Sequence, residues 1–249
     1  MVSFRNALIS RRNLLQRTAF TGVAVGLSPA LRLGQAQAAD CPVFCNEHRP
    51  KTPATALEAL IKGNERWATF AQEHPGEDEE RRECAVNGQA PFAAIISCSD
   101  SRVPPELLFD QGIGDLFVAR VAGNGATGTL AEGLYYGTSV LGALALLVLG
   151  HSDCAAVRYA VTHFPHHELE FVRLIFPAVI RARDLVEDAG GNPNDPSQVI
   201  PVATDQNVLL EVKRLRTSPF FKKMVDDGTL LVAGGVYDLK TQQVTVLIQ

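Results

Sequence analysis

The chain has little positive charge outside its first residues, and this shortage argues against one broad class of partner. All 27 acidic side chains follow residue 38, where only 18 basic side chains accompany them, a formal net charge of −9. An acidic body offers no electrostatic footprint for nucleic acid, so we expect no nucleic-acid partner. The sequence also lacks internal repeats, low-complexity stretches and evident linkers, which favours one globular domain in the body of the chain.

Long apolar runs are also missing, and the nearest approach to one lies in the first 38 residues. The run 19–31 is diluted by Gly and Thr and falls short of the ~20 residues that span a bilayer. It follows Arg11 and Arg12 and precedes Ala36-Gln37-Ala38, a small-residue cleavage pattern. Residues 1–38 resemble a removable twin-arginine export signal, which predicts a periplasmic or secreted bacterial protein without a stable membrane anchor after processing.

The five cysteines are too few and too unevenly spaced for a small disulfide scaffold, and the chain is too long to need one. Cys41 and Cys45 lie just after the predicted cleavage point, in residues 39–54, which we expect to form an extended N-terminal arm. These two can pair with each other or with another subunit, and the sequence does not decide between the two. Cys84 stands alone in the sequence.

Apolar runs alternate with helical periodicities from residue 55 to residue 249, which we expect to form one domain. The sequence predicts strands over residues 92–96, 115–122, 144–149, 230–236 and 243–248. It predicts helices over residues 55–70, 129–142, 154–164, 171–188 and 202–216. Gly63 and Asn64 would interrupt the first helix, Gly150 would end the third strand, and the charged run 73–83 would form a solvated loop and helix start. This alternation predicts an α/β fold with a mostly parallel central β-sheet, flanking helices and an antiparallel edge strand at the C-terminus.

Chemically reactive side chains follow two of these strands, each at the point where the strand ends. Cys98, Asp100 and Arg102 follow the first apolar run, and His151 and Cys154 follow the third. The carboxyl ends of parallel strands meet at one edge of a sheet, and His and Cys three apart share a face if a helix starts there. Two thiolates and one imidazole are a usual catalytic zinc set that leaves the fourth position open. We therefore expect one zinc ion per subunit.

A second cluster could also bind metal, since three imidazoles occur within five residues, at His163, His166 and His167. Pro165 interrupts the helical pattern there, and no thiol or carboxylate supports the cluster within the same turn. A hydrated surface loop is the better interpretation of this segment.

Cys98-Ser-Asp-Ser-Arg102 together with His151-x-x-Cys154 resembles the signature of the β-class carbonic anhydrases. Residues 88–92, 119–124, 148–151 and 234–238 fit the same family, so the resemblance extends from about residue 55 to the C-terminus. It implies the β-carbonic anhydrase fold and a homodimer or homotetramer. It also implies zinc-dependent reversible hydration of carbon dioxide to bicarbonate and a proton, by attack of zinc-bound hydroxide.

The resemblance also implies roles for individual residues. Asp100 would accept a hydrogen bond from the zinc-bound water, and Arg102 would hold that carboxylate in a bidentate pair. In the family the same Asp can swing onto the zinc, so Asp100 counts as a metal residue as well as a catalytic one. Arg120 fits the Arg of an accessory bicarbonate pocket found in some members, but Ile95 stands where those members have Trp, so we expect no such pocket.

Two alternatives remain open from the sequence. Relatives with the same fold and ligands hydrolyse carbonyl sulfide or carbon disulfide, and they differ in the substrate pocket and its entrance. A zinc site that only stabilises the fold or buffers metal is a third reading. The Asp100–Arg102 pair argues against that reading, because structural zinc sites usually fill all four positions with protein ligands.

Overall fold

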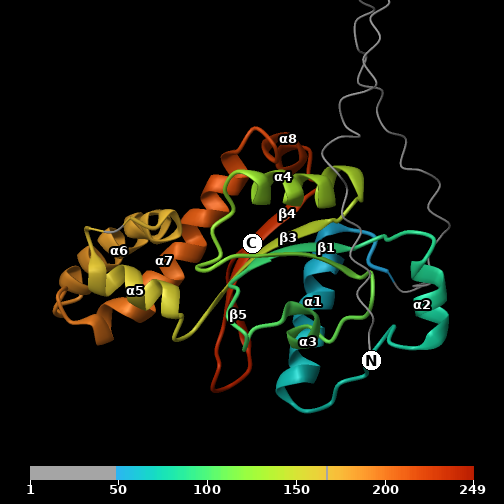
Figure 1. Ribbon diagram of the computed structural model, residues 1–249, viewed down its shortest axis with the longest axis horizontal. Helices are drawn as coiled ribbons and strands as arrows, with labels where there is room; N and C mark the ends of the chain where they lie inside the picture. Colours follow the sequence, from blue (N-terminus) through green and yellow to red (C-terminus); the bar gives the residue numbers. More distant parts are fainter. Residues whose placement is uncertain (1–48, 167) are drawn as a thin grey trace, which may run out of the picture. The chain divides into compact units, whose positions relative to one another are not determined.

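The structure is a computed structural model, and it describes residues 49–166 and 168–249 (Figure 1). Its helices are α1 (Pro53–Ala68), α2 (Glu79–Ala85), α3 (Pro105–Leu108), α4 (Thr129–Tyr135), the π-helical turn η2 (Tyr136–Val140), α5 (Ala155–His163), α6 (Glu170–Asp188), α7 (Pro196–Thr217) and α8 (Lys222–Asp226). Its strands are β1 (Ala93–Ser97), β2 (Leu116–Arg120), β3 (Ala145–His151), β4 (Leu231–Tyr237) and β5 (Val244–Ile248).

The five strands form one sheet in the order β2-β1-β3-β4-β5. β1 pairs in parallel with β2 and β3, β3 pairs in parallel with β4, and β5 joins β4 in the antiparallel sense. Parallel neighbours need crossover connections, which the helices supply. The predicted fold class is therefore confirmed, including the antiparallel edge strand at the C-terminus.

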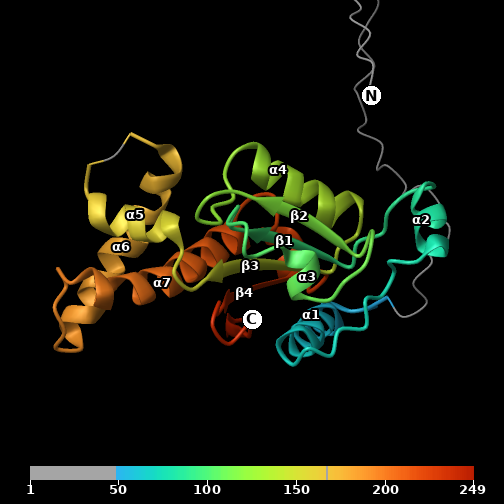
Figure 2. The same cartoon turned by 60° about the horizontal axis from the view of Figure 1, so that its bottom comes forward.

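Helices cover both faces of this sheet, and two apolar clusters fill the space between the layers. Ile95 and Leu147 belong to the cluster that α1 and α3 cover, whereas Ile96 and Leu146 belong to the cluster that α4 and α7 cover. Figures 1 and 2 show α1 and α3 on one side of the strands and α4 on the other. Because β1 and β3 are buried on both faces, they read as continuous apolar runs in the sequence.

The predicted break at Gly150 is wrong, since β3 continues through it to His151. A Cβ atom at residue 150 would lie 2.6 Å from Cγ2 of Val208 in α7, so the missing side chain lets the helix approach the strand. The helix predicted over residues 202–216 also begins earlier, at Pro196. Asp195 caps that end, its Oδ1 accepting from the backbone N–H of Ser197 at 2.9 Å.

The interruption expected at Gly63 and Asn64 is also wrong, because α1 runs through both and buries them. A Cβ at residue 63 would lie 1.8 Å from the carbonyl oxygen of Phe109, so the glycine allows a close approach of α1 to that backbone. The Asn64 amide donates to the carbonyl oxygens of Leu108 and Gln242, and its Oδ1 accepts from the N–H of Val244. One helix position therefore connects α3 and the β4–β5 hairpin.

Gly63→Ala is expected to destabilise the protein, although alanine is normally the better helix former. A Gly→Ala change inside an open helix stabilises by ~0.5–1 kcal/mol, but here the new methyl group meets backbone that cannot rotate away. We expect a loss of about 2–4 kcal/mol, as for other overpacked core sites. Gly133→Ala in α4 is the matched control, because nothing lies within 4 Å of a Cβ there. Urea unfolding of both variants tests this, and equal free energies of unfolding would contradict it.

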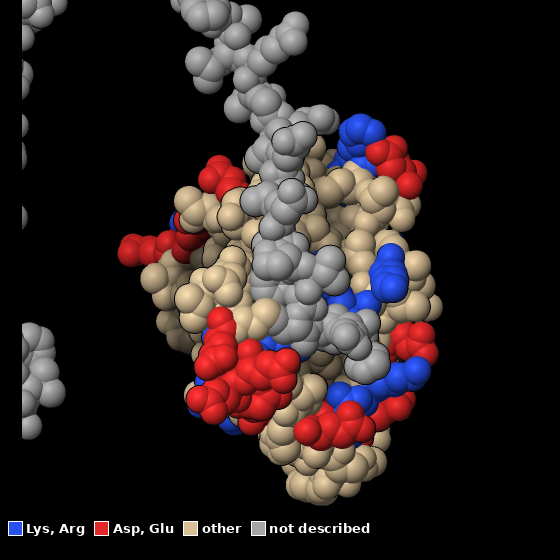
Figure 3. Space-filling model, turned by 90° about the vertical axis from the view of Figure 1, so that its right-hand side faces the viewer, with Lys and Arg blue, Asp and Glu red and all other residues tan. Residues whose placement is uncertain are grey.

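Charged side chains of both signs occupy the surface around α2 that Figure 3 faces. The segment 73–83 is mostly exposed, and α2 begins within it with Glu79 and Glu80 in its first turn, where the helix dipole favours acids. The predicted solvated loop and helix start is confirmed. Within the described ranges, no helix is long and apolar enough to cross a membrane. The predicted export signal, residues 1–38, and residues 39–48 of the predicted arm lie outside the described residues.

Candidate metal centre

The carboxyl ends of β1 and β3 bring the predicted ligands together. Ser97 is in register with Leu149, so Cys98, which follows β1, lies beside the last two residues of β3. His151 ends β3 and Cys154 immediately precedes α5, so the two do not share a helix face as the sequence predicted. A turn joins them instead, with Asp153 in the left-handed conformation at φ +54°.

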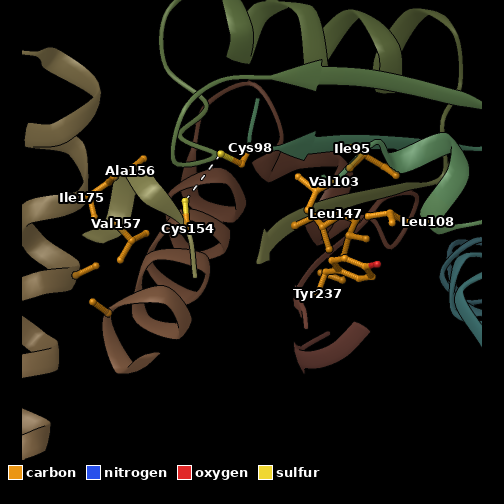
Figure 4. Close-up of a cluster of buried hydrophobic side chains, with 14 of the residues drawn as sticks. Ile95, Cys98, Val103, Leu108, Leu147, Cys154, Ala156, Val157, Ile175 and Tyr237 are labelled. Atoms are coloured by element: carbon orange, nitrogen blue, oxygen red, sulfur yellow. Dashed lines mark hydrogen bonds between the residues drawn. The ribbon is translucent and has the colours of Figure 1, made fainter. Parts of the chain in front are cut away.

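Cys98, His151 and Cys154 form the one group of three or more metal-ligating side chains found in the described part of the chain. Their ligand atoms all lie within 4.8 Å of one another, and all three residues are buried. Figure 4 shows the two sulfur atoms facing each other, 3.9 Å apart. Two thiolates on one tetrahedral zinc, each at about 2.3 Å, would lie about 3.8 Å apart. The spacing of the sulfurs fits zinc without rearrangement.

The histidine ring presents the nitrogen that a metal needs. Nδ1 lies 2.9 Å from the carbonyl oxygen of Ser152, and because a carbonyl only accepts, Nδ1 carries the proton. Nε2 is buried and has no hydrogen-bond partner among the described residues. A buried polar atom of this kind costs free energy unless something binds it. Zinc-binding histidines usually donate their other ring N–H to a carbonyl or carboxylate oxygen in this way, which fixes the orientation of the ring.

The two thiols behave as one coupled pair. The hydrogen bond with Cys154 lowers the pKa of Cys98 to about 4, aided by the backbone N–H of Gly123 and opposed by burial. The same hydrogen bond and burial raise the pKa of Cys154. The pair therefore loses its first proton more readily than its second. A metal ion that binds both sulfurs displaces the second proton, so its binding strengthens as the pH rises.

Asp100 and Arg102 form the pair predicted beside the ligands. The carboxylate accepts from Nε of Arg102 at 2.9 Å and from Nη2 at 2.7 Å, a bidentate fork, and from the Arg102 backbone N–H at 3.0 Å. This arginine holds the pKa of Asp100 well below its usual range, so the carboxylate is ionised. Its Oδ2 lies 3.8 Å from Nε2 of His151. The ionised oxygen therefore lies beside the ligand group without belonging to it.

Arg120 takes part in the site in a way that the sequence did not indicate. Its Nε donates to the carbonyl oxygen of Cys98 at 3.0 Å, and its Nη2 donates to that of Asp100 at 2.6 Å. The backbone N–H of Gly123 also donates to Sγ of Cys98, at 3.5 Å. Arg120 is the last residue of β2 and Gly123 follows it, at the same sheet edge as Cys98. Their place at a strand end is the sequence signal from which their role could have been predicted.

Two histidines of the alternative cluster, His163 and His166, lie in the described part of the chain. The ring of His163 stacks on Tyr159 with centroids 3.8 Å apart, and its Nδ1 contacts the Tyr159 carbonyl oxygen at 3.0 Å. His167 lies outside the described residues, as do Cys41 and Cys45. Cys84, which the sequence left without a partner, is disulfide-bonded, whereas Cys98 and Cys154 are free thiols.

Comparison with known proteins agrees with this geometry. Residues 93–244 match the family model described as carbonic anhydrase. The chain is 40% identical over 109 residues to carbonic anhydrase 2 of Mycobacterium tuberculosis strain H37Rv, covering 44% of this chain and 53% of that protein. It is 32% identical over 165 residues to the carbonic anhydrase of Pseudomonas aeruginosa, covering 64% of this chain and 74% of that protein. The chain thus spans about half the length of the mycobacterial relatives it matches.

Solved structures resemble the fold over a longer stretch. The β-carbonic anhydrase CcaA superposes with a TM-score of 0.59 at 28% identity, covering 76% of this chain and 94% of its own. The Coccomyxa β-carbonic anhydrase, solved in complex with acetazolamide, gives a TM-score of 0.58 at 27% identity, covering 78% of this chain and 86% of its own. With the family model matching more than half of the sequence, the chain belongs to the β-carbonic anhydrase family.

Proposed function

We propose that this chain catalyses the reversible hydration of carbon dioxide to bicarbonate and a proton, with one zinc ion per subunit. The observation that carries the proposal is the arrangement of three buried ligands, Cys98, His151 and Cys154, next to an ionised carboxylate. Three protein ligands leave one tetrahedral position for water or substrate. A site that only stabilised the fold would not need a fixed hydrogen-bond acceptor at that position.

The residues of this chain divide the work between binding and proton handling. When bound, zinc supplies a Lewis acid that lowers the pKa of a coordinated water molecule. Two thiolates offset the charge of the ion, so the water is less acidic than at a three-histidine site, and a fixed hydrogen-bond acceptor would help it to react. Asp100 is that acceptor, because it is ionised, lies beside the ligand group and would orient the reacting water through a hydrogen bond. Arg102 keeps the carboxylate ionised and fixes its direction.

Stopped-flow hydration of carbon dioxide by the purified protein, with its zinc content measured on the same sample, tests the proposal. We expect the rate to follow the zinc content and to fall to the uncatalysed value after chelation. A fully zinc-loaded protein without hydration activity would contradict the proposal. Faster release of sulfide from carbonyl sulfide or carbon disulfide than hydration of carbon dioxide would favour the hydrolase alternative.

We also infer that a second copy of the chain covers the β2 edge of the sheet, giving a homodimer or a pair of dimers. Among the described residues, β2 has one strand neighbour, β1. The ring of Phe117 on β2 contacts Tyr136, which is 47% exposed, and Val140 nearby in the chain is 42% exposed. An uncovered edge strand with an apolar border promotes association. Light scattering should give at least the mass of a dimer at micromolar concentration, and a monomer would contradict the inference.

The export signal remains a proposal that rests on the sequence. Arg11-Arg12, the short apolar run and Ala36-Gln37-Ala38 support cleavage after Ala38 and delivery of the folded protein to the periplasm or medium. N-terminal sequencing of the protein from a bacterial periplasmic fraction should begin at Ala39. An intact N-terminus in the cytoplasmic fraction alone would contradict it.

A further inference from the structure

A buried polar face of α7 contacts the loop that follows β2. Asn207 and Glu211 lie four residues apart, so they share one face of the helix, and they are only 8% and 9% exposed. The neighbouring residues Val208 and Val212 belong to the apolar cluster under the sheet. A carboxylate is seldom this buried unless it is paired. The face formed by Asn207 and Glu211 therefore has a specific partner, the loop 123–126.

Asn207 binds the first half of this loop. Its Nδ2 donates to the carbonyl oxygen of Gly123 at 2.9 Å and lies 3.5 Å from Oδ1 of Asn124. Gly123 and Asn124 both have a positive φ, at +76° and +49°. A Cβ on Gly123 would lie 2.6 Å from Cδ1 of Ile175, and the positive φ itself favours glycine at this position. The loop is thus held in a conformation that most residues avoid.

Glu211 and Arg214 bind the second half of the loop through both backbone groups of one residue. Oε1 of Glu211 accepts from the Ala126 N–H at 3.0 Å, and Nη2 of Arg214 donates to the Ala126 carbonyl oxygen at 2.7 Å. Arg214 also pairs with Glu211 through Nη2 at 2.5 and 2.6 Å. Burial raises the pKa of Glu211, and this arginine opposes the rise. The carboxylate of this pair is buried and the arginine side chain is partly exposed, so together they hold both backbone groups of Ala126 at the edge of the core.

The same loop contacts the metal site from its other side. The Gly123 N–H donates to Sγ of Cys98 at 3.5 Å, and the Gly123 carbonyl oxygen is the group that Asn207 holds. Two residues before the loop, Val121 is fixed to the end of β1 on either side of Cys98. Its N–H donates to the carbonyl oxygen of Ser97, and its carbonyl oxygen accepts from the N–H of Ser99. The position of Gly123 therefore decides whether its N–H reaches the sulfur.

We propose that Asn207 and Glu211 are positioning residues for the Cys98 side of the metal site, acting through the loop 123–126. This deepens the proposed function, since it rests on zinc binding at Cys98. N–H groups that donate to a coordinated thiolate hold the sulfur in place, and losing a contact that orients a metal ligand typically lowers metal affinity 10–100-fold. The two α7 side chains set that affinity although neither touches a ligand.

Zinc affinity, measured by competition with a chromophoric chelator, tests this without any activity assay. Asn207→Asp replaces the donor by an oxygen that repels the Gly123 carbonyl, and Glu211→Leu removes the acceptor for Ala126 N–H. Both variants should bind zinc about 10–100-fold more weakly than the parent. Glu211→Gln keeps an acceptor and should recover most of the affinity. Thr204→Val is the matched control on the same helix, since the Thr204 hydroxyl donates only to Ile200 within α7, and it should leave the affinity within about two-fold.

Replacing zinc by cobalt gives a spectroscopic test, because the thiolate-to-cobalt absorption reports on the surroundings of the Cys98 sulfur. If Asn207 only stabilised the fold, its replacement would leave this absorption unchanged. The thiolate-to-cobalt absorption should shift in Asn207→Asp and keep the parent position in Thr204→Val. Folded Asn207→Asp with parent zinc affinity and parent cobalt spectrum would overturn the proposal, and this variant decides the question if Glu211→Leu does not fold. Because the readout is metal affinity, an absence of hydration activity would count against the proposed function and leave this inference standing.

Discussion

His151→Ala should leave a folded protein that has lost its zinc and its hydration activity. The imidazole is the only neutral protein ligand of the proposed set, and its buried Nε2 has no hydrogen-bond partner in the described residues. Because loss of a residue that only orients a ligand lowers metal affinity about 10–100-fold, loss of a ligand should weaken zinc binding by more than about 100-fold. Cys98→Ser should behave in the same way, since a hydroxyl is a far poorer zinc ligand than a thiolate.

Metal analysis of the dialysed variants, with circular dichroism as a check of folding, measures this effect. His163→Ala is the matched control, because that ring stacks on Tyr159 at the surface and is outside the proposed ligand set. It should keep the zinc content of the parent. A zinc content of one per subunit in His151→Ala would exclude the proposed ligand set, whatever its activity.

Asp100→Asn should separate catalysis from metal binding. The amide is uncharged and carries N–H donors, so it no longer offers the ionised acceptor that would orient the reacting water, and we expect a loss in kcat of about 10²–10⁴-fold, the usual contribution of a positioned acid–base group. Zinc content should stay at the parent level, because Asp100 lies outside the group of Cys98, His151 and Cys154. Asp226→Asn on α8 is a suitable control, since that carboxylate pairs only with Lys222 on its own helix.

Arg102→Met gives a second test of the same pair. Without its fork, the pKa of Asp100 rises towards its ordinary value, and the carboxylate loses its fixed direction. Because Arg102 depresses that pKa in the folded protein, the stabilisation from the pair is present above the ordinary carboxyl pKa and is lost as the pH falls through the depressed one. The double variant Asp100→Asn/Arg102→Met should be no less active than the worse single variant, since the two residues act as one unit. Additive losses, or an Asp100→Asn variant at the parent rate, would contradict the role.

The ligand set could be predicted from the sequence because its signal is local. Each of Cys98 and His151 follows a run of residues buried on both faces, and parallel register brings such strand ends together. The Asp100–Arg102 fork was also predictable, since only one residue separates its partners. The predicted backbone between His151 and Cys154 was wrong. Their spacing fits one helix face, but His151 ends a strand and Cys154 precedes a helix, and the left-handed conformation of Asp153 lets the chain turn between them.

The supporting contacts could not be predicted, because they join segments with no shared periodicity. Asn207 and Gly123 are 84 residues apart, and Glu211 and Ala126 are 85 apart. A polar residue on an otherwise packed helix gives no sign of which loop it will meet. The predictions made from two glycines were wrong for a related reason, because the sequence does not show which segment packs against them. Gly63 and Gly150 look like interruptions in one dimension, but each marks a close approach by another segment.

The absent side chain at Gly150 links the quality of the core to the chemistry at the sheet edge. Val208 occupies the space that a methyl group on residue 150 would need, and it sits next to Asn207 on α7. Any bulkier residue at 150 would displace α7 outwards, and with it the contacts that α7 makes with the loop 123–126. In a screen of random variants, the loss of activity from this packing defect would look like damage to the active site itself. A metal titration would distinguish the two causes.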